Sequence, residues 1–344
     1  MLRLLSITAL LLSGWATAIA SPGAPAVAAV TVHEDILWAE PGGVPLTLDI
    51  YVPSTARASY PVVVIYHGGG WLVNDNSIMN STARYLAQEG EFVVANMNYR
   101  LLGDNGNTTR MNEIIEDALG GLLWVKTHIE DYGGDPGRVA VTGDSAGAHL
   151  AAMVLMAGQN LGTAGFAAEK PGFKPTYLPD GKTAEQVQEE DGLAVRAAVV
   201  SYGAFDLYRE ALDGFETSSN GFWEWSGTAP RSIFGGDITP RGNPELYRAV
   251  SPIYLVPPAT ERKLPPTFAH VGSEDRVTPP EAIQAFVDRM RAAGQPIEFR
   301  VYGGKRHAFL DSGCNEHLGN CFDKDAPDVL DDMIAFLKEH LRST

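Results

Sequence analysis

Residues 143–147, Gly-Asp-Ser-Ala-Gly, join two stretches with different conformational preferences. The largely apolar run 138–142 before them has the pattern of a short buried strand, and the run 148–157 after them is compatible with a helix. Glycines two positions before and two positions after Ser145 leave space for the crowded backbone of a sharp turn. Such a turn holds the hydroxyl above the edge of a sheet, so Ser145 is a candidate nucleophile.

A glycine-rich loop follows another apolar run upstream. Residues 61–66 have the composition of a buried strand and lead directly into His67-Gly68-Gly69-Gly70-Trp71. Backbone N–H groups without bulky side chains can approach a negatively charged oxygen closely. We therefore expect the N–H groups of Gly69, Gly70 and Ala146 to form an oxyanion hole. The alternative is that the three glycines make only a flexible turn.

A serine hydroxyl needs a base at neutral pH, and the base needs an acid to hold its tautomer. His307 follows the strand-like run 297–302 and a glycine pair, which places it on a loop at the carboxyl end of a strand. His317, between the two cysteines, is the alternative base. The other histidines are expected at the surface, at a helix end, or in packing and core positions: His33, His128, His340, His67, His149 and His270.

The acid is expected in the loop 272–277, which follows the strand-like run 266–271 and precedes His307 in the chain. This loop contains Glu274 and Asp275. We favour Asp275, because the shorter carboxylate suits a fixed contact with one imidazole nitrogen. The alternatives are Glu274, or a solvated acidic loop with no catalytic part.

These motifs carry a family resemblance. The chain resembles the serine esterases of the hormone-sensitive-lipase-like group and its carbohydrate-esterase relatives from about residue 46 to residue 341. The resemblance implies the α/β-hydrolase fold, the triad order Ser145, Asp275, His307, an oxyanion hole from the glycine loop and Ala146, and no cofactor. It rests on residues 67–71, Asn98-Tyr99-Arg100-Leu101, Tyr132-Gly133-Gly134-Asp135-Pro136, residues 143–147 and His307-Ala308-Phe309.

The alternation of strand and helix patterns over residues 31–344 predicts one α/β domain. We expect a mostly parallel eight-stranded sheet with helices on both faces, opening with an antiparallel pair. A long helix pattern covers 111–132, with Trp124 on its apolar face. The predicted strands are 32–38, 44–52, 61–66, 92–97, 139–142, 194–202, 267–271 and 297–302.

The segment 206–258, after the sixth strand, interrupts this alternation. It combines glycines with large aromatic residues, which is typical of a lid over a bound apolar group. The alternative is that its aromatics anchor it to the body: Phe215, Phe222, Trp223 and Trp225. Trp71, at the glycine loop, is the predicted substrate contact.

The first 20 residues have the composition of a signal peptide. Arg3 precedes the apolar run 4–12, and Ala18-Ile19-Ala20 forms a small-residue cleavage site. We expect cleavage after Ala20 and a secreted or periplasmic protein. Residues 21–30, rich in Ala and Pro, are expected to be an unstructured lead-in.

Two cysteines, Cys314 and Cys321, lie shortly after His307. In an exported protein they are expected to form a disulfide. This bridge could help to hold His307, or it could be a local staple without effect on catalysis. A zinc site is not expected, because His317 lies between the cysteines but a fourth ligand is not evident.

The chain is acidic, with 26 Lys and Arg against 42 Asp and Glu, a net charge of −16. Loss of Arg3 with the signal peptide would make the charge −17. So acidic a surface repels nucleic acid and anionic membranes and is compatible with a neutral ester substrate. The sequence does not define the oligomeric state.

The sequence therefore predicts an exported serine carboxylesterase that hydrolyses short- to medium-chain esters through an acyl-enzyme. The first alternative is a carbohydrate esterase that removes acetyl groups from xylan or feruloyl groups from plant polysaccharide. A prolyl-type serine peptidase shares the triad order, but His67-Gly68-Gly69-Gly70 and the absence of a large N-terminal propeller weigh against this alternative. An alternative from another class is a non-catalytic binding module with the hydrolase fold.

Overall fold

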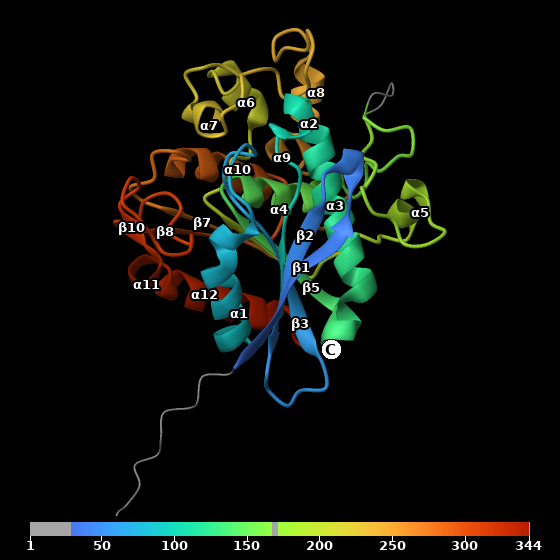
Figure 1. Ribbon diagram of the computed structural model, residues 1–344, viewed down its shortest axis with the longest axis vertical. Helices are drawn as coiled ribbons and strands as arrows, with labels where there is room; N and C mark the ends of the chain where they lie inside the picture. The colour runs from blue at the N-terminus through green and yellow to red at the C-terminus, as the bar shows by residue number, and fades with distance from the viewer. Residues whose placement is uncertain (1–28, 167–170, 344) are drawn as a thin grey trace, which may run out of the picture.

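An eight-stranded sheet forms the centre of the protein in the computed structural model, which describes residues 29–166 and 171–343. The strand order is β1-β2-β4-β3-β5-β6-β7-β8 (Figure 1). β2 pairs antiparallel with β1 and β4, and all other neighbours are parallel, which confirms the mostly parallel sheet. The strands are β1 (Val30–Ala39), β2 (Leu46–Pro53), β3 (Tyr60–Tyr66), β4 (Val93–Met97), β5 (Gly134–Asp144), β6 (Ala197–Ser201), β7 (Thr267–Gly272) and β8 (Ile297–Tyr302).

Helices cover both faces of this sheet. α1 and α12 pack together on one face, and α3 and α4 pack together on the other, as the positions of α1 and α3 in Figure 1 show. α10 packs against β7 and β8. The helices are α1 (Asn80–Gly90), α2 (Asp104–Asn107), α3 (Met111–His128), α4 (Ala146–Ala157), α5 (Ala184–Glu189), α6 (Leu207–Leu212), α7 (Gly221–Trp225), α8 (Pro244–Ala249), α9 (Pro252–Leu255), α10 (Pro280–Ala292), α11 (Phe322–Asp325) and α12 (Pro327–His340).

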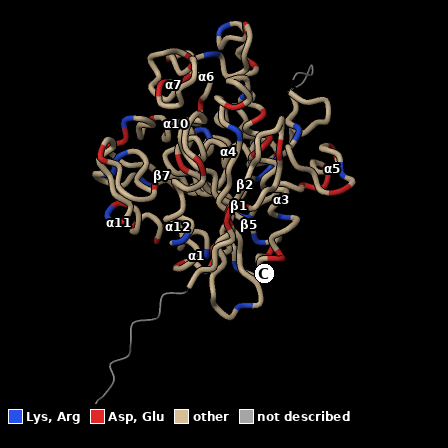
Figure 2. Tube along the Cα trace, viewed as in Figure 1, with Lys and Arg blue, Asp and Glu red and all other residues tan. Residues whose placement is uncertain are grey.

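The central strands are buried along their whole length. Every residue of β3, β4, β6 and β7 is buried, and none of these strands contains Lys, Arg, Asp or Glu. A parallel sheet covered on both faces requires such continuous apolar strands, which is why their sequences do not alternate. Figure 2 shows the charged residues on the surrounding helices and loops. Both edge strands, β1 and β8, alternate between half-buried and exposed positions over much of their length.

The long helix predicted over 111–132 consists of two parts. α3 ends at His128, and a 3₁₀ turn, Ile129–Tyr132, continues to Gly133, where φ is 77°. The left-handed conformation at this glycine ends the helix and directs the chain into β5. Trp124 is buried, as predicted from its place on the apolar face.

The segment 206–258 lies between β6 and β7 and contains α6, α7, α8 and α9. α6, α7 and α8 lie together at the top of the view in Figure 1, beyond α4 and the sheet. Trp223 is fully buried there, and its indole N–H donates to the carbonyl of Phe215 of the same segment at 2.7 Å. The predicted lid stays a prediction. The predicted signal peptide, residues 1–20, and most of the lead-in, 21–30, lie outside the described residues.

Candidate active site

Ser145 occupies a strained turn between β5 and α4. Its φ is 49° and its ψ is −116°, a conformation that residues with a Cβ seldom adopt. The Ser145 N–H donates to the carbonyl of Ser201 on β6 at 2.9 Å. A Cβ on Gly147 would lie 1.9 Å from the carbonyl oxygen of Tyr66, so only glycine fits there. The glycines on either side of Ser145 are thus explained by a sharp turn at Ser145, in which the backbone of residue 147 lies against the end of β3.

The structure brings the three predicted side chains together. Ser145 Oγ lies 2.9 Å from His307 Nε2, and His307 Nδ1 lies 2.8 Å from Asp275 Oδ2. All three side chains are buried, with 4 to 7% of each residue exposed. Each comes from the carboxyl end of a different strand: β5, β7 and β8. This arrangement allows a proton to move from the serine to the imidazole while the carboxylate holds the ring.

The two alternative residues occupy other positions. Glu274 is exposed and forms a 3.5 Å ion pair with Arg306. His317 is exposed, with its ring edge-on to Trp225 at a centroid distance of 6.1 Å. Asp275 is instead held by the backbone N–H groups of Val277 and Thr278, which both donate to its Oδ1 at 2.9 Å. The loop therefore directs Asp275 and not Glu274 toward the histidine.

Thr278 is a neighbour of the histidine that the sequence reasoning missed. Its Oγ1 lies 3.2 Å from His307 Nδ1 and donates to the carbonyl of Tyr202 at 2.7 Å. The Tyr202 ring packs edge-on against the imidazole, with centroids 5.0 Å apart. The sequence offers one signal for Thr278, which is its position three residues after Asp275. In a turn capped by an aspartate, a residue at that spacing is well placed to contact the aspartate.

The glycine loop after β3 lies beside Ser145 in the structure. Gly69 has φ +119° and Gly70 has φ +60°, and a Cβ on Gly69 would lie 2.1 Å from the carbonyl oxygen of Val73. Within the part of the chain that the structure describes, the N–H groups of Gly69, Gly70 and Ala146 donate to no protein acceptor. Free donors of this kind are what a developing oxyanion requires.

His67 shapes the start of this loop. Its ring stacks on Tyr99 at 4.3 Å, and the Tyr99 hydroxyl donates to the His67 carbonyl at 2.6 Å. Burial lowers the pKa of His67 to about 4, so the ring is neutral at physiological pH. His149 and His270 are also fully buried, in agreement with the packing and core positions predicted for them.

Two carboxyl groups, that of the buried Asp144 and that of the half-buried Asp311, lie near the nucleophile. The two groups are within hydrogen-bonding reach of each other, and Oδ1 of each has no donor among the described residues. Burial raises the pKa of Asp144 to about 6, and burial beside Asp144 raises the pKa of Asp311 well above its usual value. The N–H of Gly68 donates to Asp144 and opposes part of this rise.

Two cavities of similar size meet at Ser145. Cavity A has a volume of about 230 Å³ and includes Trp71, Phe215 and Glu210 in its lining. Cavity B has a volume of about 220 Å³ and is lined by residues that include His307, Trp225 and Leu318. Phe222 and Val277, like Ser145, line both cavities. An ester bound at Ser145 would extend one part into each cavity.

Comparison with known proteins agrees with this geometry. The family model described as BD-FAE matches residues 48–290, well over half of the chain, and the model of the dienelactone hydrolase family matches residues 257–341. The chain belongs to the BD-FAE family. The α/β-hydrolase fold expected from the sequence motifs is confirmed.

Curated relatives of this BD-FAE protein include "Isoprenylcysteine alpha-carbonyl methylesterase ICME" of Arabidopsis thaliana, 29% identical over 267 residues, which are 76% of this chain and 54% of the relative. "Probable carboxylic ester hydrolase LipM" of Mycobacterium tuberculosis is 29% identical over 279 residues, 80% of this chain and 53% of the relative. The chain thus spans about half the length of the curated relatives it matches. A solved structure of an esterase from Thermogutta terrifontis aligns with a TM-score of 0.61 at 23% identity and covers 91% of this chain and 92% of its own.

Trp71 lines cavity A in this BD-FAE protein, but only 3% of it is exposed. Its φ is 59°, and its ring packs edge-on against His149 and Phe215, with centroids 5.1 and 5.5 Å away. The side chain therefore supports the wall of cavity A. Its predicted contact with substrate stays a prediction.

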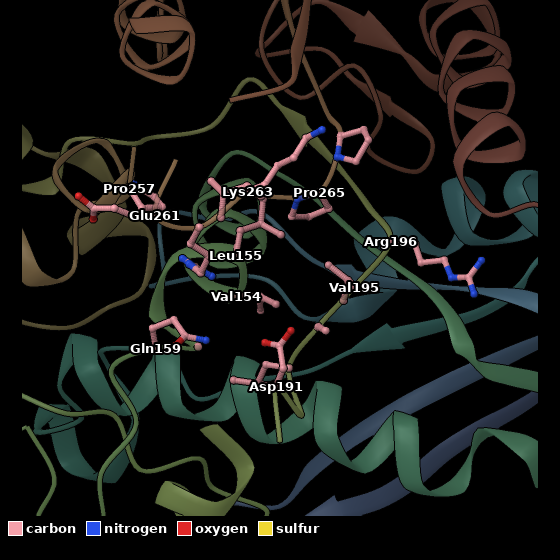
Figure 3. A pocket seen from close by; sticks show the side chains of 16 residues that line it. Val154, Leu155, Gln159, Asp191, Val195, Arg196, Pro257, Glu261, Lys263 and Pro265 are labelled. Atoms are coloured by element: carbon pink, nitrogen blue, oxygen red, sulfur yellow. The ribbon is translucent and has the colours of Figure 1, made fainter. Parts of the chain in front are cut away.

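A groove larger than either cavity lies away from the triad of this BD-FAE protein. It has a volume of about 810 Å³ and is lined by the end of α4 and by the segments that lead into β6 and β7, including Leu155, Val195 and Lys263 (Figure 3). No triad residue lines it.

Across residues 29–166 and 171–343, no helix reaches the length and apolar character that crossing a bilayer requires, and no three metal-binding side chains converge.

Proposed function

We propose that this BD-FAE protein is a serine carboxylesterase that acts on short- to medium-chain esters. The observation that carries the proposal is the continuous contact from Ser145 Oγ through His307 to Asp275, beside three free backbone N–H groups. The names of the curated relatives, which include a methylesterase and a carboxylic ester hydrolase, support the same class of reaction.

In the proposed reaction, Ser145 Oγ attacks the ester carbonyl carbon while His307 Nε2 takes the hydroxyl proton. The carbonyl oxygen becomes negatively charged and accepts hydrogen bonds from Gly69, Gly70 and Ala146. His307 then gives its proton to the leaving alcohol, which leaves an acyl group on Ser145. Water attacks this acyl-enzyme with His307 as base, and the acid is released. Asp275 stabilises the charged imidazole in both steps.

The two cavities support the proposed size of the substrate. Each is about 220 to 230 Å³, which is below the usual range of roughly 300 to 1,000 Å³ for drug-sized ligands. The walls of cavity A are aromatic at Trp71, Phe215 and Phe222, which favours an apolar group of a few carbons. We expect turnover of p-nitrophenyl esters to fall as the acyl chain lengthens beyond medium length.

Replacement of the nucleophile tests the proposal directly. Ser145→Ala should lower kcat for p-nitrophenyl butyrate by at least about 10⁴-fold, because triad members act as a unit. Its melting temperature should stay near that of the wild type. A fluorophosphonate probe should label the wild type at Ser145 and leave the variant unlabelled. Absence of both turnover and label in the folded wild type would instead favour a binding module.

A carbohydrate esterase is the second candidate, and the exposed Trp225 favours it. This residue is 60% exposed, lines cavity B and packs edge-on against Phe222 at 5.1 Å. An exposed aromatic ring beside a catalytic cavity could stack on a sugar or a phenolic ring. Rates on p-nitrophenyl acetate, acetylated xylan and methyl ferulate would separate the two candidates.

We propose further that the protein is exported. The signal-like residues 1–20 motivate this proposal, and the disulfide between Cys314 and Cys321 supports it, because such bonds persist mainly in oxidising compartments. Fractionation of the source cells, with N-terminal sequencing of the mature protein, tests it. A mature chain that starts at Ser21 is expected, and an intact Met1 on protein retained in the cytoplasm would contradict export.

A further inference from the structure

The backbone of the histidine is held by a residue distant from the rest of the triad. Asp275 and Thr278 contact the ring of His307 at Nδ1. On the other side, the side-chain amide of Asn320 donates a hydrogen bond to the His307 carbonyl. Asn320 is only 8% exposed, so water does not compete freely for this bond.

This bond acts at a strained point of the chain. Ala308, directly after His307, has φ 63°, in the left-handed region that residues with a Cβ avoid. Such a conformation persists only where surrounding contacts hold it. The peptide group between His307 and Ala308 carries the carbonyl to which Asn320 donates, so Asn320 fixes the orientation from which the imidazole projects.

Asn320 is itself held by a very short hairpin. β9 (Cys314–Asn315) pairs with β10 (Asn320–Cys321), with Asn315 opposite Asn320 and Cys314 opposite Cys321. Strand pairs of two residues each are too short to be stable alone. The disulfide joins the two cysteines at one end of this hairpin, and the N–H of Gly319 donates to the Asn315 carbonyl at 2.7 Å at the other.

We infer that Asn320 is a positioning residue for His307, and that the Cys314–Cys321 disulfide keeps Asn320 in place. The inference rests on the proposed function, since it concerns the histidine of the esterase site. Loss of the Asn320 amide would let the His307–Ala308 peptide rotate, and Nε2 would spend less time within reach of Ser145 Oγ. Asn320 lines neither cavity, so loss of its amide removes no direct contact with substrate. Asn315, His317 and Leu318 of the same hairpin line cavity B, so opening the hairpin by reduction should also raise KM.

Reduction of the disulfide should have the same effect on His307. A dithiol such as dithiothreitol supplies two electrons and two protons; the sulfur–sulfur bond breaks, two cysteine thiols form, and the reductant becomes a cyclic disulfide. Cys314 is exposed, so the reagent has access to the bond. The hairpin would then lose its covalent closure, and Asn320 its fixed position.

Asn320→Ala and Asn320→Asp test the first part, since neither side chain has an amide donor. We expect kcat for p-nitrophenyl butyrate to fall about tenfold in both, with KM within about twofold of the wild type. The rate of Ser145 labelling by a fluorophosphonate should fall in parallel. Glu316→Gln, on the exposed turn of the same hairpin, is the matched control and should keep the wild-type kcat.

A double-mutant cycle with the disulfide tests the second part. Reduction of the wild type, or Cys314→Ser with Cys321→Ser, should lower kcat about as much as Asn320→Ala does. Reduction of Asn320→Ala should lower it little further, because both changes act through the same amide. Equal slowing of the wild type and the variant by reduction would show that the disulfide acts by another route.

The experiments distinguish a missing role of Asn320 from a missing esterase activity. A folded wild type without turnover or label removes the esterase proposal itself. An active wild type whose kcat survives both Asn320 substitutions removes only the role of Asn320. If the Asn320 variants do not fold, reduction of the wild type still decides, and an unchanged kcat with the free thiols confirmed by titration would overturn the inference.

Discussion

The serine side and the histidine side of the site are built differently. On the serine side, β3, β5 and α4 leave no space: added Cβ atoms at Gly143 and Gly147 would lie 2.4 Å or less from neighbouring backbone. On the histidine side, His307 lies on an irregular loop where hydrogen bonds from side chains, and one disulfide, fix the backbone. Close packing positions the nucleophile, and polar contacts position the base.

The difference implies different weaknesses. Steric positioning fails when atoms are added, and positioning by hydrogen bonds fails when donors or acceptors are removed. Substitutions that enlarge glycines should therefore damage the serine side, and isosteric substitutions of polar groups should damage the histidine side.

Asp275→Asn should give the largest effect on the histidine side. The amide keeps the shape of the carboxyl group but favours the wrong tautomer of His307, so we expect kcat to fall by about 10⁴-fold. Glu274→Gln, one residue away, is the control and should stay within about twofold of the wild type, because the Glu274 carboxylate pairs with Arg306 at the surface. Steady-state kinetics on p-nitrophenyl butyrate measures both, and equal losses would show that the loop was assigned incorrectly.

Gly69→Ala is the corresponding test on the serine side. The Cβ of the alanine would lie 2.1 Å from the Val73 carbonyl oxygen, and the backbone φ at this position is +119°. The loop must therefore move, and the N–H of residue 69 must leave the oxyanion hole. We expect kcat to fall roughly 10²- to 10³-fold, the usual cost of one oxyanion donor. Gly43→Ala also has a positive φ, of +83°, but nothing lies within 4 Å of its added Cβ. That variant should lose some stability and no activity.

Thr278→Val should have a smaller effect. Valine keeps the shape of threonine but removes the hydroxyl that lies 3.2 Å from His307 Nδ1. It also leaves the Tyr202 carbonyl without its donor, so we expect a loss of about 1–3 kcal/mol of stability and about a three- to tenfold lower kcat. Thr278→Ser retains the hydroxyl and should restore most of the rate. If serine fails to restore it, the methyl group and not the hydroxyl is what the histidine needs.

Asp311→Asn should change the pH dependence of stability more than the rate. Because the folded-state pKa of Asp144 is raised to about 6, its stabilising contribution is complete below about pH 4 and is lost as pH rises through 6. Burial and the neighbouring Asp144 also raise the pKa of Asp311, and asparagine removes that ionisable group, so the drop in melting temperature from pH 5 to pH 8 should be smaller by about 2 °C or more. A thermal melt at both pH values measures this. An identical drop in both proteins would show that the two carboxyl groups are not coupled.

Most of the fold could be predicted from the sequence because its signals are local. The continuous apolar runs of β3 and β6 identify buried strands, and the glycines around Ser145 identify a sharp turn between a strand and a helix. The same local signals placed Ser145, Asp275 and His307 at the ends of strands. Asp275 was separated from Glu274 only by an argument about side-chain length, and the structure supports it through the Oδ1 contacts with the loop backbone.

Other contacts of the site have no local signal. Asn320 reaches His307 from 13 residues away, and Asp144 meets Asp311 although the two are on different halves of the chain. Thr278 near His307 depends on the path of one loop over Tyr202. Each of these pairs exists only because strand order and loop packing bring the two residues within hydrogen-bonding reach, which no spacing along the chain encodes.

The sequence by itself determined the sheet, the turn at Ser145 and the residue types available for catalysis, since periodicity and glycine placement act over a few residues. Tertiary structure alone decided which polar groups surround the histidine, that two cavities meet at Ser145, and that Asp144 and Asp311 lie beside each other. Hydrogen bonds and burial depend on atoms within a few ångströms in space, and the packing of the whole domain sets those distances.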